Sequence, residues 1–402
     1  MNTREDPIRL ATRGSDLALR QAAAVKETLE ARRHAVELVE VETTGDRISE
    51  ELIHRLGKTG AFVRALDERV LEGDCDAAVH SMKDVPTEMP PELVVAGVPE
   101  RASAGDVLLT PTGGGLDALP EGAVVGTSSL RRRAELLAAR PDLEVRQLRG
   151  NVDTRVEKLL APRRQREHER RLAAAGELDA DAGENEADDT DPDNAASEDV
   201  TDEPAHTEGY EQADGEYERT PREWFEGLSE VERRALGREV DTEYDAIVLA
   251  AAGLERAGLA RQLDVRELPA EEFVPAPGQG ALAVTARDDE RGELLHDALD
   301  HPRTRVETTV ERVVLSTLGG GCIAPMGAHA VVQGEYVHAA VRVLDQDGEE
   351  EIGATRDLSV ERHPEAAREL AAELAERGAA DLIAAARVDT DTEGEPGAKR
   401  IE

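Results

Sequence analysis

The sequence predicts an α/β protein that ends in a smaller α+β domain. Short apolar runs alternate with amphipathic helical patterns from residue 8 to about 160, and again over 244–259. Strand–helix alternation of this kind predicts mostly parallel sheets covered by helices. Ligands of such lobes bind at the carboxyl ends of the strands, where the loops lie. Over the last hundred residues the pattern changes to a hairpin followed by a long helix.

Each predicted helix of the first part begins or ends at a residue that favours that boundary. Ser15 is a suitable N-cap, Gly73 ends the helix predicted over 61–73, and Pro141 stops the helix over 130–141. A further helix is expected from Asn151. The predicted strands are 8–12, 35–43, 75–81, 93–99, 107–110, 122–128 and the first part of 244–259.

Residues 161–240 differ in composition from the rest. Between Gly176 and Thr220 there are 18 Asp and Glu residues against one basic residue, Arg219, which is typical of a disordered, solvated segment. A capping box of Thr220 with Glu223 then favours the start of a helix. We interpret 161–240 as a largely disordered acidic insertion. A salt-solvating role is favoured, and an interaction role stays open.

The last hundred residues predict a small α+β domain. The pattern over 335–358 indicates a hairpin that turns at Asp347-Gly348, and 363–383 has the periodicity of a helix. Cys322 lies at the entrance of this domain.

The charge of the chain excludes several classes of partner. Its 402 residues carry a formal net charge of −39, which argues against nucleic acid or an anionic membrane. Only 2% of the residues are aromatic, so few side chains are available to stack on bases. An acidic chain with five lysines among 48 basic residues indicates adaptation to high salt, where screening weakens the repulsion between carboxylates.

No segment predicts export or membrane insertion. The N-terminal residues lack the apolar run of a signal peptide, and no stretch reaches transmembrane length. We therefore expect a cytoplasmic protein. The two cysteines make no disulfide framework, and no Cys/His spacing suits zinc, so no metal is expected.

One cysteine follows three consecutive glycines. Gly319, Gly320 and Gly321 lead directly into Cys322, and glycine permits a close approach to the backbone and a positive φ. The stretch is either a flexible turn with an incidental thiol or the presentation of a sulfur that takes part in chemistry.

Arginines recur at the strand-to-helix junctions of this acidic chain. The set comprises Arg9, Arg13, Arg131, Arg132, Arg133, Arg149 and Arg155. Cations in the first turn of a helix are disfavoured by the helix dipole unless an anion lies between them and the free amides. The pattern predicts a cleft for a carboxylate or phosphate ligand, to which the planar guanidinium is suited. The alternative is a set of salt bridges to the abundant Asp and Glu residues.

Two further motifs suit ligand binding or catalysis. The strand that ends in VHSMKDVP presents His80, Ser81, Lys83 and Asp84. A carboxylate beside a lysine at this position suits acid–base work or stabilisation of a cation. Taken alone, Asp84 favours a turn carboxylate and His80 a structural histidine. The loop 55–63, with Lys58, either cradles an anion or acts as a lid.

Eight motifs occur in order along the chain. They are RLATRGSDLAL, GKTGAFV, AAVHSMKDVP, VGTSSLRRRAEL, LRGNVDTR, YDAIVLAAAGLERAGL, PAPGQGAL and GGGCIAP. Together they resemble the porphobilinogen deaminase (hydroxymethylbilane synthase) family. The resemblance covers nearly all of the chain outside 161–240 and the tail.

The resemblance implies three domains, and a monomer is the family expectation. Two are α/β lobes like those of periplasmic binding proteins, and the third is a small C-terminal α+β domain that carries the cofactor cysteine. The expected boundaries are 1–100 with 279–298 for the first lobe, 104–160 with 241–275 for the second lobe, which holds the 161–240 insertion, and 302–402 for the C-terminal domain.

The resemblance also implies a transferase of tetrapyrrole (porphyrin and heme) biosynthesis. Such enzymes condense four porphobilinogen molecules head to tail with loss of ammonia and release hydroxymethylbilane. Their dipyrromethane cofactor is bound through a thioether, here by motif position at Cys322, and Asp84 matches the catalytic aspartate. The matching cofactor-binding positions are Ser81, Lys83, Thr127, Ser129, Arg131 and Arg132. The matching substrate-binding positions are Arg9, Arg13, Lys58, Arg149, Arg155 and Arg256.

The chain departs from the family pattern at a few positions. The family commonly has lysines where this chain has Arg55 and Thr59, and usually a glutamate where it has Thr285. Cys75 matches no functional position and is interpreted as a strand thiol. The rival hypothesis is a non-catalytic bilobal binding protein for small carboxylates, against which the absence of a signal peptide and the presented Cys322 argue.

Overall fold

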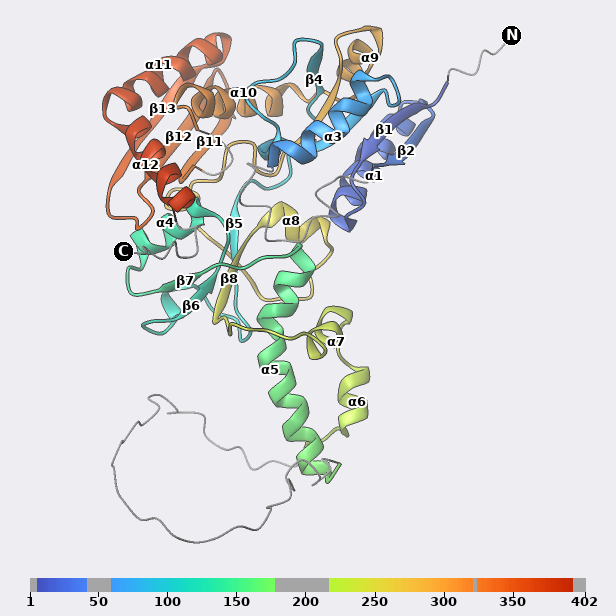
Figure 1. The fold of residues 1–402 in the computed structure, drawn as a ribbon, viewed down its shortest axis with the longest axis vertical. Coiled ribbons are helices and arrows are strands. Elements are labelled where there is room, and N and C mark those ends of the chain that lie inside the picture. The colour runs from blue at the N-terminus through green and yellow to red at the C-terminus, as the bar shows by residue number, and fades with distance from the viewer. Residues whose placement is uncertain (1–5, 42–58, 178–216, 321–323, 393–402) are drawn as a thin grey trace, which may run out of the picture. The chain divides into compact units, whose positions relative to one another are not determined.

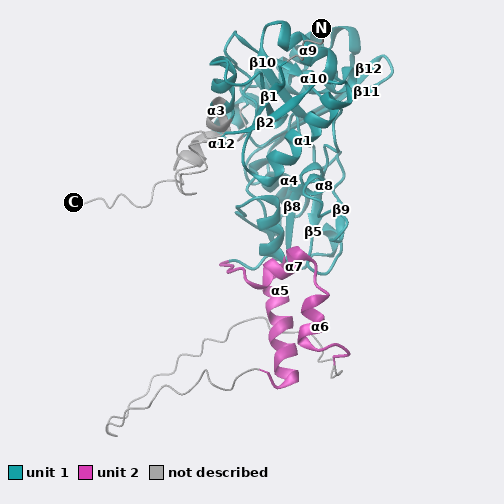
Figure 2. Cartoon of the chain, turned by 90° about the vertical axis from the view of Figure 1, so that its right-hand side faces the viewer, with its two compact units in different colours: residues 1–159, 242–402 teal, residues 160–241 magenta. Residues whose placement is uncertain are grey.

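The structure is a computed structural model that describes residues 6–41, 59–177, 217–320 and 324–392. The chain divides into two compact units (Figure 2). Unit 1 comprises residues 1–159 and 242–402, and unit 2 comprises residues 160–241. Three β-sheets with their helices make up the described part of unit 1 (Figure 1).

The first sheet combines strands from distant parts of the chain. In order across the sheet, its strands are β2 (Val36–Glu40), β1 (Ile8–Thr12), β3 (Ala77–Ser81), β10 (Leu282–Arg287) and β4 (Leu93–Gly97). β10 runs antiparallel to both of its neighbours, whereas β1 is parallel to β2 and β3. Helices α1 (Asp16–Ala31), α3 (Thr59–Leu71) and α9 (Glu290–Leu299) pack on this sheet. We call this assembly lobe 1.

The second sheet repeats the same plan. In order, its strands are β7 (Glu144–Arg146), β6 (Val124–Gly126), β8 (Ala246–Ala250), β5 (Asp106–Leu109) and β9 (Val265–Glu267). Here β5 is the antiparallel strand. Helices α4 (Leu130–Ala139) and α8 (Ala251–Arg256) and the 3-10 turn η3 (Leu116–Ala118) belong to it, and α5 (Val152–Ala175) follows β7. We call this assembly lobe 2.

Two crossovers, residues 98–105 and 268–281, join the lobes. The antiparallel strand of each sheet, β5 or β10, is the first strand after one of these crossovers. The other four strands of each sheet run in one direction, as the alternating pattern predicts.

The predicted helix boundaries are confirmed where a capping residue marks them. The Ser15 side chain accepts a hydrogen bond from the Ala18 amide at the start of α1, and Ser129 caps α4 in the same way. α4 ends at Ala139, just before Pro141. The short strand β9 was not predicted, because three residues with little burial carry no periodic signal.

A third sheet forms the C-terminal domain. Its strands are β11 (Met326–Gln333), β12 (Tyr336–Leu344) and β13 (Glu351–Ser359), and its helices are α10 (Pro302–Thr317), α11 (His363–Glu376) and α12 (Ala379–Thr392), with the 3-10 turn η4 (Val360–Arg362) before α11. The hairpin predicted at Asp347-Gly348 is confirmed as β12–β13, with Gly348 at φ 73°. β11 adds a third strand that the sequence pattern did not show. The predicted α/β class with two lobes and a small C-terminal α+β domain is thus confirmed.

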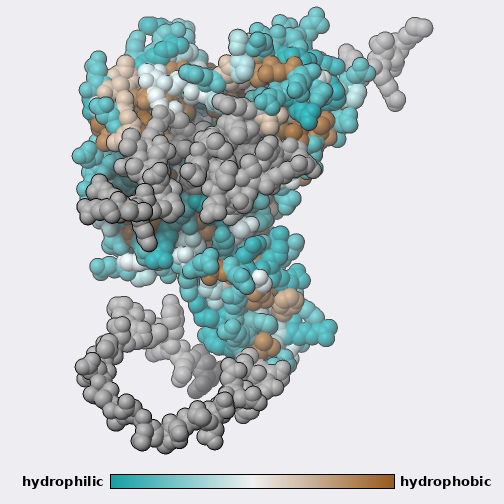
Figure 3. Space-filling view, in the orientation of Figure 1, coloured by the Kyte–Doolittle hydropathy of each residue, from teal (hydrophilic) through white to brown (hydrophobic). Residues whose placement is uncertain are grey.

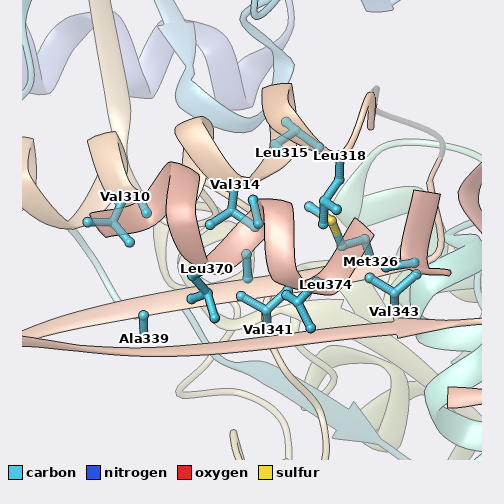
Figure 4. Packing of buried hydrophobic residues seen from close by; sticks show 14 of the residues in the cluster. Val310, Val314, Leu315, Leu318, Met326, Ala339, Val341, Val343, Leu370 and Leu374 are labelled. Carbon is cyan, nitrogen blue, oxygen red and sulfur yellow. The ribbon is translucent and has the colours of Figure 1, made fainter. Parts of the chain in front are cut away.

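Apolar packing joins the helices of this domain to its sheet. Figure 4 shows Val314 of α10 and Leu370 and Leu374 of α11 close to Val341 of β12. All four are almost fully buried. Burial of one such side chain stabilises a fold by about 1.5–3 kcal/mol.

Gly319 and Gly320 end α10 in a Schellman motif. The Gly320 amide donates to the Leu315 carbonyl at 2.9 Å and the Gly319 amide to the Ser316 carbonyl at 3.2 Å. Gly319 has φ 68°, which is the left-handed conformation that this motif requires. Two of the three glycines are therefore explained by the helix end. Gly321 and Cys322 lie outside the described residues.

Unit 2 is helical in its described parts. It contains the later turns of α5, together with α6 (Pro221–Glu226) and α7 (Glu230–Leu236). The predicted capping box of Thr220 with Glu223 is present, and His168 stacks on the buried Trp224 with 5.7 Å between ring centroids.

The segment 161–240 therefore begins and ends in helices: α5 continues to Ala175, and α6 begins at Pro221 as its capping box predicts. Composition did not show that a single tryptophan and its neighbours would form a small packed unit. The acidic residues 178–216, on which the expectation of disorder rested, lie outside the described residues.

The described surface is mostly hydrophilic on the face seen in Figure 3, with scattered apolar patches. Among the described residues, no helix combines the length and apolar character needed to span a membrane.

Candidate active site

A cavity of about 330 Å³ lies at the carboxyl ends of strands from both lobes. Lobe 1 contributes residues that follow β1 and β3, lobe 2 contributes the end of β8 and α8, and the second crossover contributes Gln279 and Gly280. This is where an α/β fold is expected to bind its ligand. The predicted site residues that line it are Arg13, Ser81, Lys83, Asp84 and Arg256.

Asp84 belongs to a short 3-10 turn, η2 (Met82–Asp84), that follows β3 directly. The Met82 amide donates to the Ala281 carbonyl at 3.0 Å, and the Val85 amide closes the turn on the Met82 carbonyl at 3.2 Å. Val85 is extended, as a residue before proline prefers to be, so Pro86 ends the turn. Sequence and topology together place the Asp84 carboxyl at the cavity wall.

The second crossover passes very close to this turn. Gly278 has φ 76°, and a Cβ on it would lie 2.7 Å from Met82 Cγ and 3.1 Å from the Lys83 amide nitrogen. Gly280 is confined in the same way by the first crossover, with a Cβ 2.6 Å from the Ala102 carbonyl oxygen. The PGQG motif therefore needs its glycines for close backbone approach.

Lys83 lies among competing charges. Asp84 raises the pKa of Lys83, but desolvation by the cavity walls and the positive charges of Arg132 and Arg155 outweigh this effect, and the pKa is lowered. The side chain keeps access to the solvent of the cavity. An anionic ligand would relieve the repulsion between these cations.

Two turns of lobe 2 bring further predicted residues together. The turn after β6 and the turn after β7 are joined by hydrogen bonds from the Thr127 amide to the Arg146 carbonyl, 3.0 Å, and from the Leu148 amide to the Thr127 carbonyl, 3.3 Å. Thr127 Oγ1 accepts from the Ser129 amide at 3.2 Å, and Ser129 Oγ accepts from the Arg132 amide at 3.4 Å. Both hydroxyl groups therefore have local capping roles.

Three predicted site arginines form no ion pair with a carboxylate among the described residues: Arg149, Arg155 and Arg256, of which Arg256 lines the cavity. Arg155 Nε donates to the Gly150 carbonyl at 2.8 Å, and Arg256 Nη2 donates to the Gly280 carbonyl at 2.8 Å. Burial, followed by repulsion from Arg132, lowers the pKa of Arg155 to about 10. Partly buried cations without a counter-ion fit a site for an anion.

Arg131 and Arg132 are placed differently, because both are buried on Asp106. Arg131 Nη2 lies 2.6 Å and Arg132 Nη2 2.8 Å from the Asp106 carboxylate oxygens. Arg131 Nη1 also donates to Glu135 at 2.6 Å. The two arginines are 3% and 6% exposed, so the alternative of intramolecular salt bridges is realised at this junction.

The pKa values of the two carboxyl groups in this cluster, Asp106 and Glu135, are shifted in opposite directions. Burial raises the pKa of Asp106, but Arg131 and Arg132 outweigh it and hold that pKa well below its usual range. Burial, together with repulsion from Asp106, raises the pKa of Glu135 to about 8 even though Arg131 lowers it. At neutral pH, Asp106 is the main negative charge that balances the two arginines.

Gln279 connects this cluster to the cavity that it lines. Its Nε2 donates to Asp106 Oδ1 at 2.8 Å and its Oε1 lies 3.4 Å from Arg132 Nη2. Sequence reasoning missed Gln279, Asp106 and Glu135. The available signals were the position of Gln279 between the glycines of PGQG and the i,i+4 spacing of Glu135 to Arg131 on one helix. Asp106 gave none, because an acidic residue before an apolar strand does not reveal its partner.

His80 is held by two buried residues. Its Nε2 lies 3.0 Å from Asp67 Oδ1 and 3.1 Å from Thr285 Oγ1, and the Thr285 hydroxyl donates to Asp67 at 2.6 Å. An ionised Asp67 accepts only, so this network favours a proton on Nε2. Thr285, a departure from the family pattern, thereby has a partner.

One predicted site residue, Arg9, is held away from the cavity. Arg9 lies on β1 away from the carboxyl end, where its Nη2 donates to the Gly73 carbonyl at 2.8 Å and its Nε lies 3.8 Å from Asp76. We therefore correct the prediction and leave Arg9 out of the site. Cys322 and Lys58 lie outside the described residues.

Comparison with known proteins bears on what this cavity does. Residues 8–178 and 230–294 match the family domain described as porphobilinogen deaminase, dipyromethane cofactor binding domain, and residues 306–378 match the porphobilinogen deaminase C-terminal domain. The chain belongs to the porphobilinogen deaminase family. The break in the match, between 178 and 230, falls inside the acidic insertion.

Curated relatives agree with this assignment to the porphobilinogen deaminase family. A probable porphobilinogen deaminase of Halobacterium salinarum is 57% identical over 398 residues, which cover 95% of this chain and 98% of the relative. The porphobilinogen deaminase of Rubrobacter xylanophilus is 38% identical over 93% of this chain and 95% of its own. Among solved structures, an ABC-transporter periplasmic substrate-binding protein from Coxiella burnetii covers 74% of this chain and 94% of its own at 14% identity. Its TM-score of 0.33 is too low to carry an inference.

Proposed function

We propose that this chain is a porphobilinogen deaminase of the transferase class. It condenses four porphobilinogen molecules head to tail, releases ammonia at each addition and gives hydroxymethylbilane. The observation that carries the proposal is the position of Asp84 beside Lys83 on a cavity that Arg13 and Arg256 also line. A non-catalytic carboxylate-binding protein would need the cations, but it would not need the carboxyl group of Asp84 on a turn held by hydrogen bonds.

The cationic side chains suit the carboxylates of the substrate and of the growing chain. Each porphobilinogen carries an acetate and a propionate, so every addition brings two negative charges. Arg13, Lys83 and Arg256 line the cavity, and Arg149 and Arg155 are half-buried without a carboxylate partner among the described residues. Guanidinium groups bind carboxylates through paired hydrogen bonds.

Asp84 has the chemistry to stabilise a cation formed from the substrate. Loss of ammonia from the aminomethyl group of porphobilinogen leaves a positively charged methylene pyrrole. A carboxylate near the pyrrole N–H stabilises that charge and accepts its proton, and such preorganised groups contribute more inside a partly desolvated cavity than in water. Lys83, with its lowered pKa, would hold a substrate carboxylate beside Asp84.

The same residues fit a dipyrromethane, which carries acetate and propionate groups as well. Lys83, Ser81, Ser129, Thr127 and Arg132 are the residues that would hold it, and Arg132 retains a buried Nε without a hydrogen-bond partner among the described residues. When bound, the dipyrromethane supplies the pyrrole end to which substrate units are added. Arg131 is more deeply committed to Asp106 and Glu135, so we assign it a supporting role.

We further propose that Cys322 carries the dipyrromethane through a thioether and that the protein is a cytoplasmic monomer. We keep the domain boundaries 1–100 with 279–298, 104–160 with 241–275, and 302–402. The strands of the three sheets fall within these ranges, which supports the boundaries.

Intact-mass measurement tests this function, with Cys75 as the matched control. The purified protein should be heavier than its sequence by one dipyrromethane. Cys322→Ser should have the bare mass, and Cys75→Ser, which alters a buried thiol of lobe 1, should keep the increment. A wild-type protein of bare mass that does not consume porphobilinogen in high salt would refute the proposal.

A further inference from the structure

An arginine of the C-terminal domain holds the backbone that follows Asp84. Arg312 of α10 donates from Nη1 to the Val85 carbonyl at 2.8 Å and from Nη2 to the Pro86 carbonyl at 2.7 Å. These two carbonyls directly follow η2, the turn that carries Asp84. The guanidinium thus spans successive carbonyls with both of its terminal nitrogens.

The same helix makes a second contact of this kind at a different place. Two turns earlier on α10, Arg305 donates to the Val95 carbonyl at 3.0 Å and to the Ala96 carbonyl at 2.9 Å. Residues seven apart lie on one face of a helix. This face of α10 is therefore fixed to lobe 1 by two similar arginine clamps, one on the Asp84 turn and one on β4.

Glu311 fixes α10 to both crossovers. Its fully buried carboxylate accepts from Arg101 at 2.7 and 3.0 Å, from the Gly278 amide at 2.7 Å and from the Ala330 amide at 2.9 Å. Arg101 belongs to the first crossover and Gly278 to the second. The helix that carries Arg312 is thus a fixed support.

Side-chain packing alone does not hold the turn on this side. A cavity of about 250 Å³ lies beside the clamp and is lined by Met82 and Thr87 of lobe 1 and by Arg305 and Arg312 of α10, among others. Because space remains next to the turn on this side, the hydrogen bonds from Arg312 to the carbonyls of Val85 and Pro86 supply support here that packing does not.

We propose that Arg312 is a positioning residue for Asp84, an inference that rests on the catalytic role proposed above for that aspartate. Arg312 fixes the carbonyls of Val85 and Pro86 and so sets the place of the Asp84 carboxyl at the cavity wall. The same helix ends at Gly319 and Gly320, and Cys322 follows in the sequence. One element therefore anchors the Asp84 turn and leads into the segment with the proposed cofactor cysteine.

A small displacement of a catalytic group is enough to reduce turnover. A misplacement of about 1 Å can cost on the order of 100-fold in rate. Glutamine cannot span two carbonyls with a planar fork, and lysine offers a point charge in its place. Arg312→Gln should therefore release the turn, and Arg312→Lys should restore only part of the rate.

Arg305→Gln is the matched control for Arg312→Gln. It removes the same kind of clamp from the same helix but acts on β4 and not on the Asp84 turn. We expect kcat for porphobilinogen to fall about tenfold or more in Arg312→Gln, with KM changed less than about twofold, and kcat to stay within about twofold in Arg305→Gln. Arg305 also pairs with Asp300 at 2.6 Å, so Arg305→Gln should lower the melting temperature at least as much as Arg312→Gln does.

Hydrogen exchange gives a readout that does not depend on turnover. The amides of residues 81–87 should exchange faster in Arg312→Gln than in the wild type and in Arg305→Gln. Unchanged exchange there, or equal losses of kcat in the two variants, would overturn the inference. An inactive wild type of bare mass would instead refute the proposed function.

Discussion

Lobe 1 and lobe 2 share one sheet order, and both place charged residues at the carboxyl edge of the sheet, but they use these charges differently. In lobe 1, Lys83 and Asp84 line the cavity. In lobe 2, Arg131 and Arg132 turn inward and share the buried carboxylate of Asp106. The same kind of junction thus serves a ligand site in one lobe and the interior of the protein in the other.

This difference shows what an arginine at a helix start does and does not indicate. A cation there requires a compensating anion, but that anion can be a ligand or a carboxylate of the chain itself. Arg155, which has no carboxylate partner among the described residues, and Arg131, which has two, look alike in the sequence. The contrast can be tested by substitutions in each lobe.

The largest expected effect on stability is that of Asp106→Ala. Removing this carboxylate leaves two buried guanidinium groups without their main counter-ion, and breaking a buried pair in this way costs about 3–5 kcal/mol. Chemical denaturation in high salt would measure the loss. As control, Asp347→Ala removes the exposed partner of Arg133 and should change stability little. Equal effects of the two substitutions would contradict the internal role of Asp106.

Asp84→Ala should lower turnover and leave stability almost unchanged, the opposite of what we expect for Asp106→Ala. We expect the melting temperature to stay close to that of the wild type, because Asp84 lies on a cavity wall. Loss of a group that stabilises charge in the transition state should lower kcat by about 100–1,000-fold. Steady-state kinetics and a thermal melt on the same preparation make the test. Normal turnover would remove Asp84 from the catalytic role.

The smallest expected effect concerns the pH dependence of lobe 2. The pKa of Glu135 is raised to about 8 from its ordinary value of 4.5, so between these pH values the folded protein holds a proton that the unfolded chain releases. The contribution of this proton to the free energy of unfolding is fully present below pH 4.5 and is lost as pH rises through about 8.

Glu135→Gln mimics the protonated carboxyl and should reduce this decline. We expect the wild type to lose a few degrees of melting temperature between pH 5 and pH 8.5, and Glu135→Gln to lose less. Identical pH profiles of the two proteins would show that Glu135 is not the titrating group. Asp106, whose pKa is lowered, does not titrate in this range.

Much of the fold was predictable because its signals are local. The N-cap Ser15, the Pro141 stop and the Thr220 capping box each act within a few residues, and all are present in the structure. The site was predictable in part. Asp84, Lys83 and Arg13 reach the cavity because each follows the carboxyl end of a strand.

The rest of the site could not be predicted, because its contacts join residues far apart in the chain. Arg9 is on a strand of the right lobe but not at its carboxyl end. Unit 2 contains few aromatic and apolar residues, so the acidic composition of the segment did not reveal that its helices would pack together. The roles predicted for Cys322 and Lys58 stay predictions, since neither is among the described residues.

By itself, the sequence determined the α/β class, the helix boundaries, the order of the motifs and the excess of negative charge. These follow from propensity, capping and composition, which act locally or over the whole chain. Only the tertiary structure decided which cations face the cavity, because the order of the strands determines which carboxylate lies next to each guanidinium. Asp106 meets Arg131 and Arg132 across lobe 2, and Arg312 reaches the carbonyls after Asp84 from 227 and 226 residues away.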